Sequence, residues 1–443
     1  MPRRYFGTDG VRGRVGQFPL TVDFALHLAS AAARVLAPNG GTVLVGKDTR
    51  LSGYMFESAL EAGFVAAGVN VVLCGPLPTP AIAHLTKKLG YSFGAVISAS
   101  HNPFDDNGIK FFDGDGRKLD DAIEAEIERA LDESPVTRES SAIGSATRLA
   151  SARIQYQDFL ASLVPEDTDF TGLDIVIDCA HGAAYKVGPR VLQDLGATVT
   201  SLGTSPNGRN INLRCGSTSP QLMQRAVPAI EASLGIALDG DADRLVMADS
   251  EGNLVDGDQI LYVIAKARQQ HGTLRGPVVG TVMSNFGLEE ALATLDIEFV
   301  RAQVGDRYVL EQLRQRGGVL GGEASGHILC LDRVTSGDAL AAAIEVLGII
   351  QETGRSLAEL VSGMTKYPQV LNSVRLNERI DICEVDEVQR AIVEAEGALC
   401  GQGRVVLRSS GTELVVRVMV EAKNRDLAES VADTLSTVVA RSI

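Results

Sequence analysis

The sequence has few of the features that mark membrane, secreted or nucleic-acid-binding proteins. No stretch approaches the ~20 consecutive apolar residues of a membrane-spanning helix, and the first residues lack the apolar run of a signal peptide. Basic residues are also in short supply, because 41 Lys and Arg stand against 56 Asp and Glu. The resulting net charge of -15 repels a phosphate backbone. We therefore expect a cytoplasmic protein that acts on neither nucleic acid nor a membrane.

Cysteine pairs and common catalytic motifs are missing as well. The six cysteines are spread over the whole chain without a Cys-x-x-Cys pair, which argues against a disulfide framework or a zinc site. The run 41–47 has the outline of a P-loop, but Asp48 follows where Ser or Thr is required. No Gly-x-Ser-x-Gly esterase motif occurs. Lys47, Asp48 and Arg50 are instead expected to help shape a loop of the first domain.

The sequence does contain a repeated alternation of strand-like and helix-like segments. At roughly 100 to 200 residues per domain, a chain of this length predicts about two to four domains. Short β-branched runs alternate with Ala-, Leu- and Glu-rich stretches, which is typical of mainly parallel sheets with crossover helices. We expect α/β domains over 1–145, 152–252 and 253–366, and a smaller, more antiparallel domain over 368–443. Three units of similar size suggest an ancient triplication.

The strand-like runs fall at regular intervals within these domains. They cover 42–45, 69–73 and 94–97 in the first domain, and 173–178, 198–202 and 235–238 in the second. They cover 277–281, 298–302 and 318–321 in the third, and 370–376, 404–407 and 415–422 in the last. Helices are expected at 22–36, 54–67, 81–89, 121–131 and 338–353, with a final helix from Arg425. A Ser-rich, weakly patterned stretch over 134–151 marks the first boundary.

A hydroxyl follows the third strand of the first domain. The run Ile97–Pro103 leaves a buried strand, so Ser100 is expected at the carboxyl end of that strand, where open α/β sheets bind ligands. His101, Asn102 and Pro103 restrict the turn that would present the hydroxyl. The same residues are also common in turns without any catalytic role. The segment alone therefore does not decide between a functional hydroxyl and a structural turn.

Three carboxylates alternate directly after a strand of the second domain: Asp239, Asp241 and Asp243. Such a cluster repels itself unless a cation neutralises it. The spacing is similar to the start of a calcium loop, but Arg244 replaces its Gly and Ser250 its bidentate Glu, which excludes an EF-hand. A hard divalent cation, Mg²⁺ beside a phosphate, is the functional interpretation, and a solvated acidic turn is the alternative.

Two further segments carry groups suited to a sugar and to a phosphate. Glu323, Ser325 and His327 are flanked by glycines and combine an acceptor, a hydroxyl and an imidazole, which suits recognition of a polyhydroxylated or amino sugar. The segment Arg408–Glu413 offers a guanidinium, three hydroxyls and a Gly that lets backbone N–H groups converge on an anion. It is therefore interpreted as a phosphate clamp. For each segment an ordinary turn is the alternative.

Taken together and in this order, the four segments resemble the α-D-phosphohexomutase superfamily over the whole chain. More narrowly, the runs Tyr5–Gly13, Gly46–Met55 and Ile97–Phe112 are similar to the bacterial phosphoglucosamine mutases. The resemblance implies an α/β fold with four domains around a central cleft: three similar α/β domains with mixed sheets and a smaller α+β C-terminal phosphate-binding domain. It also implies an isomerase that interconverts glucosamine 6-phosphate and glucosamine 1-phosphate, and so feeds UDP-N-acetylglucosamine and cell-wall synthesis.

The resemblance also implies roles for individual residues in phosphoryl transfer. Ser100 would be phosphorylated, giving its phosphoryl group to the sugar and regaining one from the other end of glucosamine 1,6-bisphosphate. One Mg²⁺ per active site would be held by Ser100, Asp239, Asp241 and Asp243. The candidates that stabilise the transferring phosphoryl group are Arg12, Lys110 and Arg244, with Lys110 or His101 as proton shuttle.

The remaining roles concern the substrate. Glu323, Ser325 and His327 would contact the sugar, while Arg408, Ser410, Gly411 and Thr412 would hold the non-reacting phosphate. The runner-up activity is that of a phosphomannomutase or phosphoglucomutase, because the same serine, metal and clamp would serve any hexose phosphate. A non-catalytic sugar-phosphate sensor would need a broken nucleophile or metal loop, and neither is broken. The expected partner is thus a small-molecule sugar phosphate, and a homodimer remains open.

Overall fold

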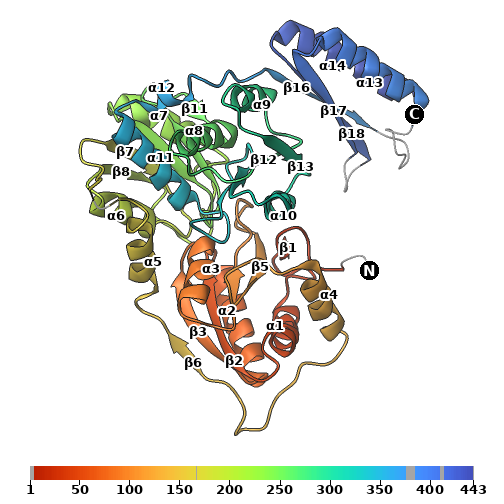
Figure 1. Cartoon of the computed structure of the whole chain (residues 1–443). Coiled ribbons are helices and arrows are strands. Elements are labelled where there is room, and N and C mark those ends of the chain that lie inside the picture. Colours follow the sequence, from red (N-terminus) through yellow and green to blue (C-terminus); the bar gives the residue numbers. More distant parts are fainter. Residues whose placement is uncertain (1–3, 166, 376–384, 410–413, 443) are drawn as a thin grey trace.

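A computed structural model of the chain describes residues 4–165, 167–375, 385–409 and 414–442, and these residues form four sheets with their helices (Figure 1). The first three sheets mix parallel and antiparallel strands. The last sheet is antiparallel throughout. This architecture confirms the expected α/β class. None of the helices in the described part of the chain combines the length and the apolar composition that a membrane crossing requires.

The first sheet has six strands in the order β1-β5-β4-β2-β3-β6. They are β1 (Val11–Arg14), β2 (Gly41–Lys47), β3 (Val69–Pro76), β4 (Phe93–Ile97), β5 (Asp106–Asp113) and β6 (Ala146–Arg148). Their helices are α1 (Val22–Leu36), α2 (Ser52–Ala66), α3 (Thr79–Lys88) and α4 (Asp121–Ala130). Strand β6 pairs in parallel with β3, so the first sheet continues past residue 145, the expected end of the first domain. The three residues of β6 are all exposed, so no apolar alternation marks this strand in the sequence.

The second and third domains have smaller sheets. The second sheet has the strand order β11-β10-β9-β7-β8. Its strands are β7 (Asp174–Asp178), β8 (Thr198–Leu202), β9 (Leu234–Leu238), β10 (Leu245–Ala248) and β11 (Leu254–Val255). The helices of this domain are α5 (Ala152–Ala161), α6 (Val187–Asp194) and α7 (Gln221–Ala229). The third, in the order β13-β12-β14-β15, contains β12 (Val278–Thr281), β13 (Phe299–Ala302), β14 (Leu320–Gly322) and β15 (Ile328–Cys330). The helices that follow β11 are α8 (Gly257–Gln270), α9 (Phe286–Ala293), α10 (Asp306–Arg316), α11 (Ala339–Thr353) and α12 (Leu357–Val361).

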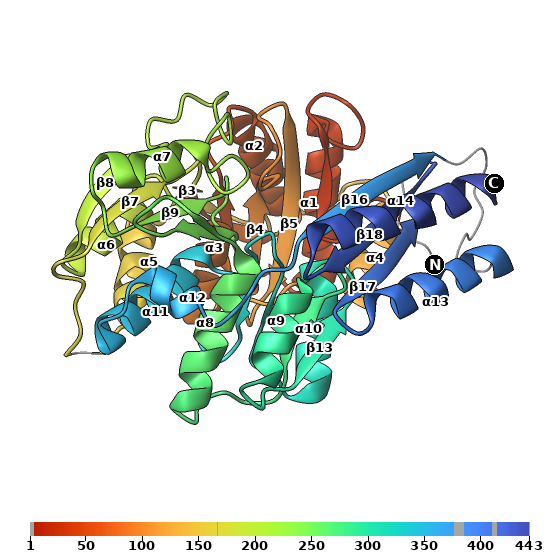
Figure 2. The same cartoon turned by 90° about the horizontal axis from the view of Figure 1, so that it is seen from above.

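The C-terminal domain is a three-stranded sheet with two described helices. Its strands β16 (Gln369–Arg375), β17 (Gly403–Ser409) and β18 (Val415–Ala422) pair in the order β16-β18-β17, and its helices are α13 (Asp386–Leu399) and α14 (Arg425–Arg441). The core of this domain, which includes Val418 and Leu435, is separate from the other apolar clusters. Figure 2 shows the domain set to one side of the other three.

The three α/β sheets share one strand order, which supports the suggested triplication. Numbered from the first core strand of each domain, the order is 2-1-3-4 in β3-β2-β4-β5, in β8-β7-β9-β10 and in β13-β12-β14-β15. In each case the fourth strand runs antiparallel to the third. The loops between third and fourth strands are 98–105, 239–244 and 323–327. These equivalent loops carry the serine, the carboxylates and the sugar-loop residues singled out above.

One continuous apolar core joins the first three domains. It contains Ile82 of α3, Ile177 of β7, Leu288 of α9 and Leu347 of α11, all fully or almost fully buried. The opposite face of the first sheet has a core of its own with α1, α2 and α4. Because close-packed interiors resist deformation, the shared core fixes the first three domains relative to one another. The loops at their strand ends are therefore held at defined positions.

Helix α8 begins with a buried carboxylate that bears on stability. Asp256 caps the helix, and Asp258 in its first turn is 1% exposed. One oxygen of Asp258 accepts the backbone N–H of Asn285 at 2.7 Å, whereas the other has no hydrogen-bond partner among the described residues. Burial, and after it the charge of Asp256, raises the pKa of Asp258 to about 7.

We expect Asp258→Asn to change how stability depends on pH. A carboxyl group whose pKa rises on folding binds more protons in the native state, so its contribution to the free energy of unfolding falls as pH rises from about 4 to about 7. The neutral amide removes this dependence. The melting temperature of the variant minus that of the unsubstituted protein should therefore become more positive from about pH 5 to about pH 8. The corresponding change in the difference between their free energies of unfolding is on the order of 2 to 4 kcal/mol. Thermal melts at both pH values measure it, with exposed Asp194→Asn as control. A pH-independent difference would contradict the assignment.

Candidate active site

The three equivalent loops converge on one cavity of about 470 Å³. Each loop leaves its sheet at the carboxyl end of a strand next to the point where the strand order reverses, the usual ligand position in such sheets. The predicted site residues that line the cavity are Arg12, His101, Asp243, Arg244, Glu323, Ser325, His327 and Arg408. They come from all four domains, although they are far apart in the sequence.

Ser100 is held in an uncommon backbone conformation at the bottom of its loop. Its φ of 51° lies in the left-handed region that few residues other than Gly adopt. The Ser100 N–H donates to Ser98 Oγ at 2.9 Å, and its carbonyl accepts from Arg50 at 3.1 Å and from Asn212 at 2.9 Å. These bonds offset the conformational cost and direct the side chain. The hydroxyl donates to Asp239 Oδ2 at 2.5 Å, so it faces the carboxylate cluster of the second domain.

Arg50 and Asp48 shape the serine loop, as expected. Both side chains are fully buried and pair with each other. Arg50 also donates to the carbonyl of Asn102 at 2.6 Å, which together with its bond to Ser100 ties down two carbonyls of the loop. Lys47 takes no part in this contact, because it pairs with Glu57 and lies over the ring of Tyr54. It therefore anchors α2 rather than the serine loop.

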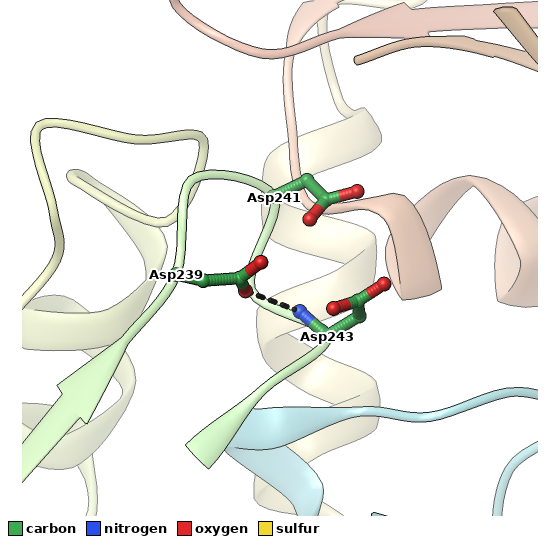
Figure 3. A group of neighbouring side chains, drawn as sticks. All are labelled: Asp239, Asp241 and Asp243. Atoms are coloured by element: carbon green, nitrogen blue, oxygen red, sulfur yellow. Dashed lines mark hydrogen bonds between the residues drawn. The ribbon is translucent and has the colours of Figure 1, made fainter. Parts of the chain in front are cut away.

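Asp239, Asp241 and Asp243 point toward one another from a single turn (Figure 3). One oxygen of each carboxylate lies within 4.8 Å of the others. The turn is closed by the backbone N–H groups of Asp243 and Arg244, each of which donates to Asp239 Oδ1 at 3.1 Å. Ala242, at a φ of 59°, permits this tight wrap. Carboxylates at alternate positions of the sequence therefore come together as three neighbouring acceptors on one turn.

The donor set of this turn fits a hard divalent cation. All three carboxylates are buried, and Asp241 Oδ1 and Asp243 Oδ1 have no hydrogen-bond partner among the described residues. Burial, and then the charges of Asp243 and Asp241, raises the pKa of Asp239 well above its ordinary value. Buried and partly unpaired carboxylate oxygens are the ligands that Mg²⁺ prefers. The three aspartates could therefore hold a metal ion next to the Ser100 hydroxyl.

Lys110 and Arg12 place positive charge beside the cluster. Lys110 Nζ lies 2.9 Å from Asp241 Oδ2 and 2.7 Å from Asp9 Oδ2. Burial lowers the pKa of Lys110, but Asp241, Asp9 and Asp243 outweigh this effect and raise it above the ordinary value. Arg12 pairs with the same Asp9. Arg244 lies nearby, with its Nε 3.9 Å from Asp243 Oδ1. The site therefore keeps permanent cations beside the carboxylate cluster that the Ser100 hydroxyl faces.

His101 is a neutral group close to the serine hydroxyl. Its Nδ1 lies 3.4 Å from Ser100 Oγ. Burial, followed by the positive charges of Arg244 and Arg12, lowers the pKa of His101 to about 4. The imidazole is thus uncharged near neutral pH, and it can accept a proton that Lys110 cannot.

The sugar loop presents its three predicted residues in different ways. Glu323 Oε1 accepts the backbone N–H of Gly305 at 3.0 Å, and Ser325 is exposed on the cavity wall. His327 is 4% exposed, with its Nδ1 3.6 Å from Asp243 Oδ1 and its Nε2 3.2 Å from Asp306 Oδ2. Burial lowers the pKa of His327, but Asp243 and Asp306 outweigh it and raise the pKa. Direct contact of this ring with a sugar stays a prediction.

The C-terminal domain contributes one described residue to the cavity. Arg408, near the end of β17, lies on the cavity wall. The other predicted clamp residues, Ser410, Gly411 and Thr412, lie outside the described residues. Arg404 on the same strand donates to the carbonyls of Val282 at 2.8 Å and Ser284 at 2.6 Å, which attaches this domain to the third.

Several polar residues at the site were not singled out from the sequence. Thr79 donates to Asp241 Oδ2 at 2.6 Å, and Asn212 holds the Ser100 carbonyl. Asp9, Lys118 and Asp306 form an ion-pair chain between the first and third domains. Asp9 belongs to the opening run Tyr5–Gly13 and could have been found there. The others carry no local motif.

Comparisons with known proteins agree with this geometry. The chain matches the phosphoglucomutase/phosphomannomutase family in four consecutive parts: α/β/α domain I over 3–137, domain II over 155–252, domain III over 256–367 and the C-terminal domain over 371–438. It is 54% identical over 444 residues to a protein of Alcanivorax borkumensis named phosphoglucosamine mutase, with 100% of both chains covered.

Solved structures with lower identity share the fold. A phosphoglucomutase/phosphomannomutase family protein of Burkholderia thailandensis has a TM-score of 0.80 at 24% identity, covering 98% of this chain and 97% of that one. The N-acetylphosphoglucosamine mutase of Aspergillus fumigatus, solved with GlcNAc-6P and magnesium, has a TM-score of 0.72 at 20% identity, covering 100% and 96%. With full-length identity above half to a phosphoglucosamine mutase, this chain belongs to the phosphoglucosamine mutase family of the α-D-phosphohexomutase superfamily.

Proposed function

We propose that this chain interconverts glucosamine 6-phosphate and glucosamine 1-phosphate by passing a phosphoryl group through Ser100. The observation that carries the proposal is the placement of the Ser100 hydroxyl, 2.5 Å from Asp239 in a three-carboxylate turn that also pairs with Lys110. A hydroxyl between acceptors for a divalent cation and fixed positive charges suits phosphoryl transfer, which depends on positioning and charge neutralisation. Ordinary turn chemistry does not account for this convergence of two domains.

Each transfer exchanges one oxygen–phosphorus bond for another. A hydroxyl of the bound sugar monophosphate attacks the phosphorus of phosphorylated Ser100, the bond from phosphorus to Ser100 Oγ breaks, and glucosamine 1,6-bisphosphate forms. The second transfer returns the other phosphoryl group to Ser100 and leaves the isomeric monophosphate. Arg12, Lys110 and Arg244 neutralise the equatorial oxygens during both transfers. Ser100 is thus the leaving group in the first transfer and the nucleophile in the second.

The proton of the attacking hydroxyl needs an acceptor. His101, whose pKa of about 4 leaves it neutral near pH 7, takes this proton and returns it in the second transfer. Lys110 stays protonated because of its carboxylate neighbours and acts as a fixed charge. Of the two candidate shuttles, the geometry and charge therefore favour His101.

Asp239, Asp241 and Asp243, with an oxygen from Ser100, would hold Mg²⁺. Bound there, the metal would neutralise charge on the phosphoryl oxygens. The sugar would lie against Glu323 and Ser325, and Arg408 would pair with the phosphate that does not react. The two transfers use opposite ends of the sugar, so a different phosphate is the non-reacting one in each. Arg408 must therefore be able to pair with either phosphate.

A coupled assay that ranks kcat/KM for glucosamine 6-phosphate, glucose 6-phosphate and mannose 6-phosphate tests the proposal. It contains magnesium and a trace of bisphosphate. We expect a preference of at least about 10-fold for the amino sugar, because Glu323 can pair with the protonated 2-amino group. Equal turnover of a neutral hexose would agree with the phosphoserine mechanism but contradict glucosamine phosphate as the preferred substrate. No turnover of any of the three sugar phosphates would contradict the proposed mutase activity itself.

A further inference from the structure

A turn of the first domain reaches across to the third domain beside the active site. Residues 114–118 follow β5 and fold back on it, so that Lys118 forms a β-bridge with Phe112. At the tip, the carbonyl of Gly116 accepts a hydrogen bond from Thr335 Oγ1 of the third domain at 2.6 Å. Gly116 has a φ of 72°, and a side chain there would meet the carbonyl oxygen of Ala83 in α3 at 2.2 Å. The turn is therefore closely fitted against α3 and is bonded at its tip to the third domain.

Lys118 carries the second contact of this turn. Its ammonium group pairs with Asp9 Oδ1 of the first domain at 2.5 Å and with Asp306 Oδ2 at the start of α10. All three side chains are at least four-fifths buried, with exposed fractions of 19% for Lys118, 14% for Asp9 and 13% for Asp306. Buried ion pairs define geometry because any change leaves an uncompensated charge.

Each carboxylate that Lys118 bridges also contacts a group in the active site. Asp9 pairs through its other oxygen with Lys110 and Arg12, and Lys110 in turn pairs with Asp241 of the carboxylate turn. Asp306 lies 3.2 Å from His327 Nε2, and the neighbouring Gly305 N–H donates to Glu323. A continuous chain of charges therefore runs from the carboxylate turn, through Lys118, to the sugar loop.

We propose that Lys118 is a positioning residue that sets the phosphoryl-binding cations of the first domain at a fixed distance from the sugar loop of the third. Lys118 is not among the described residues that line the cavity of about 470 Å³, whereas its partners Asp9 and Asp306 are, so it acts through these two carboxylates. Without the ammonium group, two buried carboxylates would face each other across the domain contact and push the loops apart. A misplacement of about 1 Å is enough to cost about 100-fold in rate.

The inference rests on the proposed function and is tested with the same assay on the full chain. Lys118→Met keeps the length and removes the charge, and we expect kcat to fall about 100-fold while KM for the sugar phosphate changes less than about 3-fold. Lys118→Arg keeps both ion pairs and should retain at least about one third of kcat. Lys87→Met, an exposed lysine at the end of α3, is the matched control and should behave as the unsubstituted chain.

A second pair of variants covers the case in which Lys118→Met does not fold. Asp306→Asn keeps the shape but removes the charge that pairs with Lys118 and with His327 Nε2, so kcat should fall about 10-fold. Combined with Lys118→Met where that variant folds, its effect on kcat should be clearly less than additive. Where Lys118→Met does not fold, the fall in kcat of Asp306→Asn alone is the test, and an unchanged kcat would overturn the inference.

The opposite results would overturn the inference. They are a Lys118→Met variant that melts earlier but keeps kcat within about 3-fold, or strictly additive effects in the double variant. An unsubstituted chain without any mutase turnover would instead remove the proposed function itself, and the inference with it.

Discussion

Ser100→Ala is expected to lower kcat by on the order of 10⁴-fold or more, because the variant has no oxygen to carry the phosphoryl group between the two ends of the sugar. The fold should remain, since the hydroxyl makes its contacts with Asp239 and His101 and adds nothing to the apolar core. The lost hydrogen bond costs about 1 kcal/mol. Turnover with bisphosphate present, melting temperature and intact mass measure the three parts of this expectation.

The control for this variant is Ser58→Ala, which removes an exposed hydroxyl on α2 whose one hydrogen bond within the described part of the chain goes to the Tyr54 carbonyl. It should leave kcat and melting temperature unchanged. Intact mass should show a phosphoryl group on the unsubstituted chain after treatment with bisphosphate, and none on Ser100→Ala. Near-normal turnover of Ser100→Ala would reject Ser100 as the phosphoryl carrier, whatever the mass spectra show.

Asp241→Asn should lower kcat/KM about 100-fold and raise the magnesium concentration for half-maximal activity about 10-fold. One oxygen of Asp241 binds Lys110 and Thr79, and the other has no hydrogen-bond partner among the described residues. The amide keeps the shape but loses a ligand charge and the partner of Lys110. Excess magnesium should therefore restore activity only in part. A magnesium titration with activity as readout measures both parameters.

Asp194→Asn is the matched control, because it makes the same chemical change in the same domain on an exposed residue of α6. Its magnesium curve should overlay that of the unsubstituted chain. If Asp241→Asn also gave an unchanged half-maximal concentration, the metal assignment would fail. If magnesium restored full activity, Asp241 would be a ligand without the second role of orienting Lys110.

Segments with strong periodicity could be predicted closely from the sequence. Helix α1 begins and ends at the expected residues 22 and 36, and β8 covers the expected 198–202. Both are marked by local patterns that do not depend on the rest of the fold. The pairing of strands could not be predicted in this way. Helix α11, expected over 338–353, packs against α8 and also against β10 of the second domain, because its apolar residues face more than one partner.

The residues of the site likewise differ in how far the sequence predicts them. The spacing of the three aspartates predicts that they converge, and the turn brings them together. That Ser100 faces them was implied by the family resemblance rather than by any local pattern. Lys118 and Asp306 are single charged residues, and nothing near them in the sequence distinguishes them from solvated surface charges. Only the packing of two domains makes them partners. Arg50 was expected to help shape a loop of the first domain, but its two carbonyl contacts depend on the path of the chain after Ser100.

The separate core of the C-terminal domain has a consequence for the catalytic cycle. Its described contacts with the third domain are polar: the Arg404 bonds to two carbonyls, a Gln369 bond to Met283 and the pair Lys423–Glu290. Such bonds exchange readily with water, whereas moving any of the other three domains would open their common apolar interior. We therefore expect an outward displacement of the domain that carries Arg408 to cost less free energy than a displacement of any of the other three domains. The half-converted sugar would then have room to reverse end for end without returning to bulk solvent.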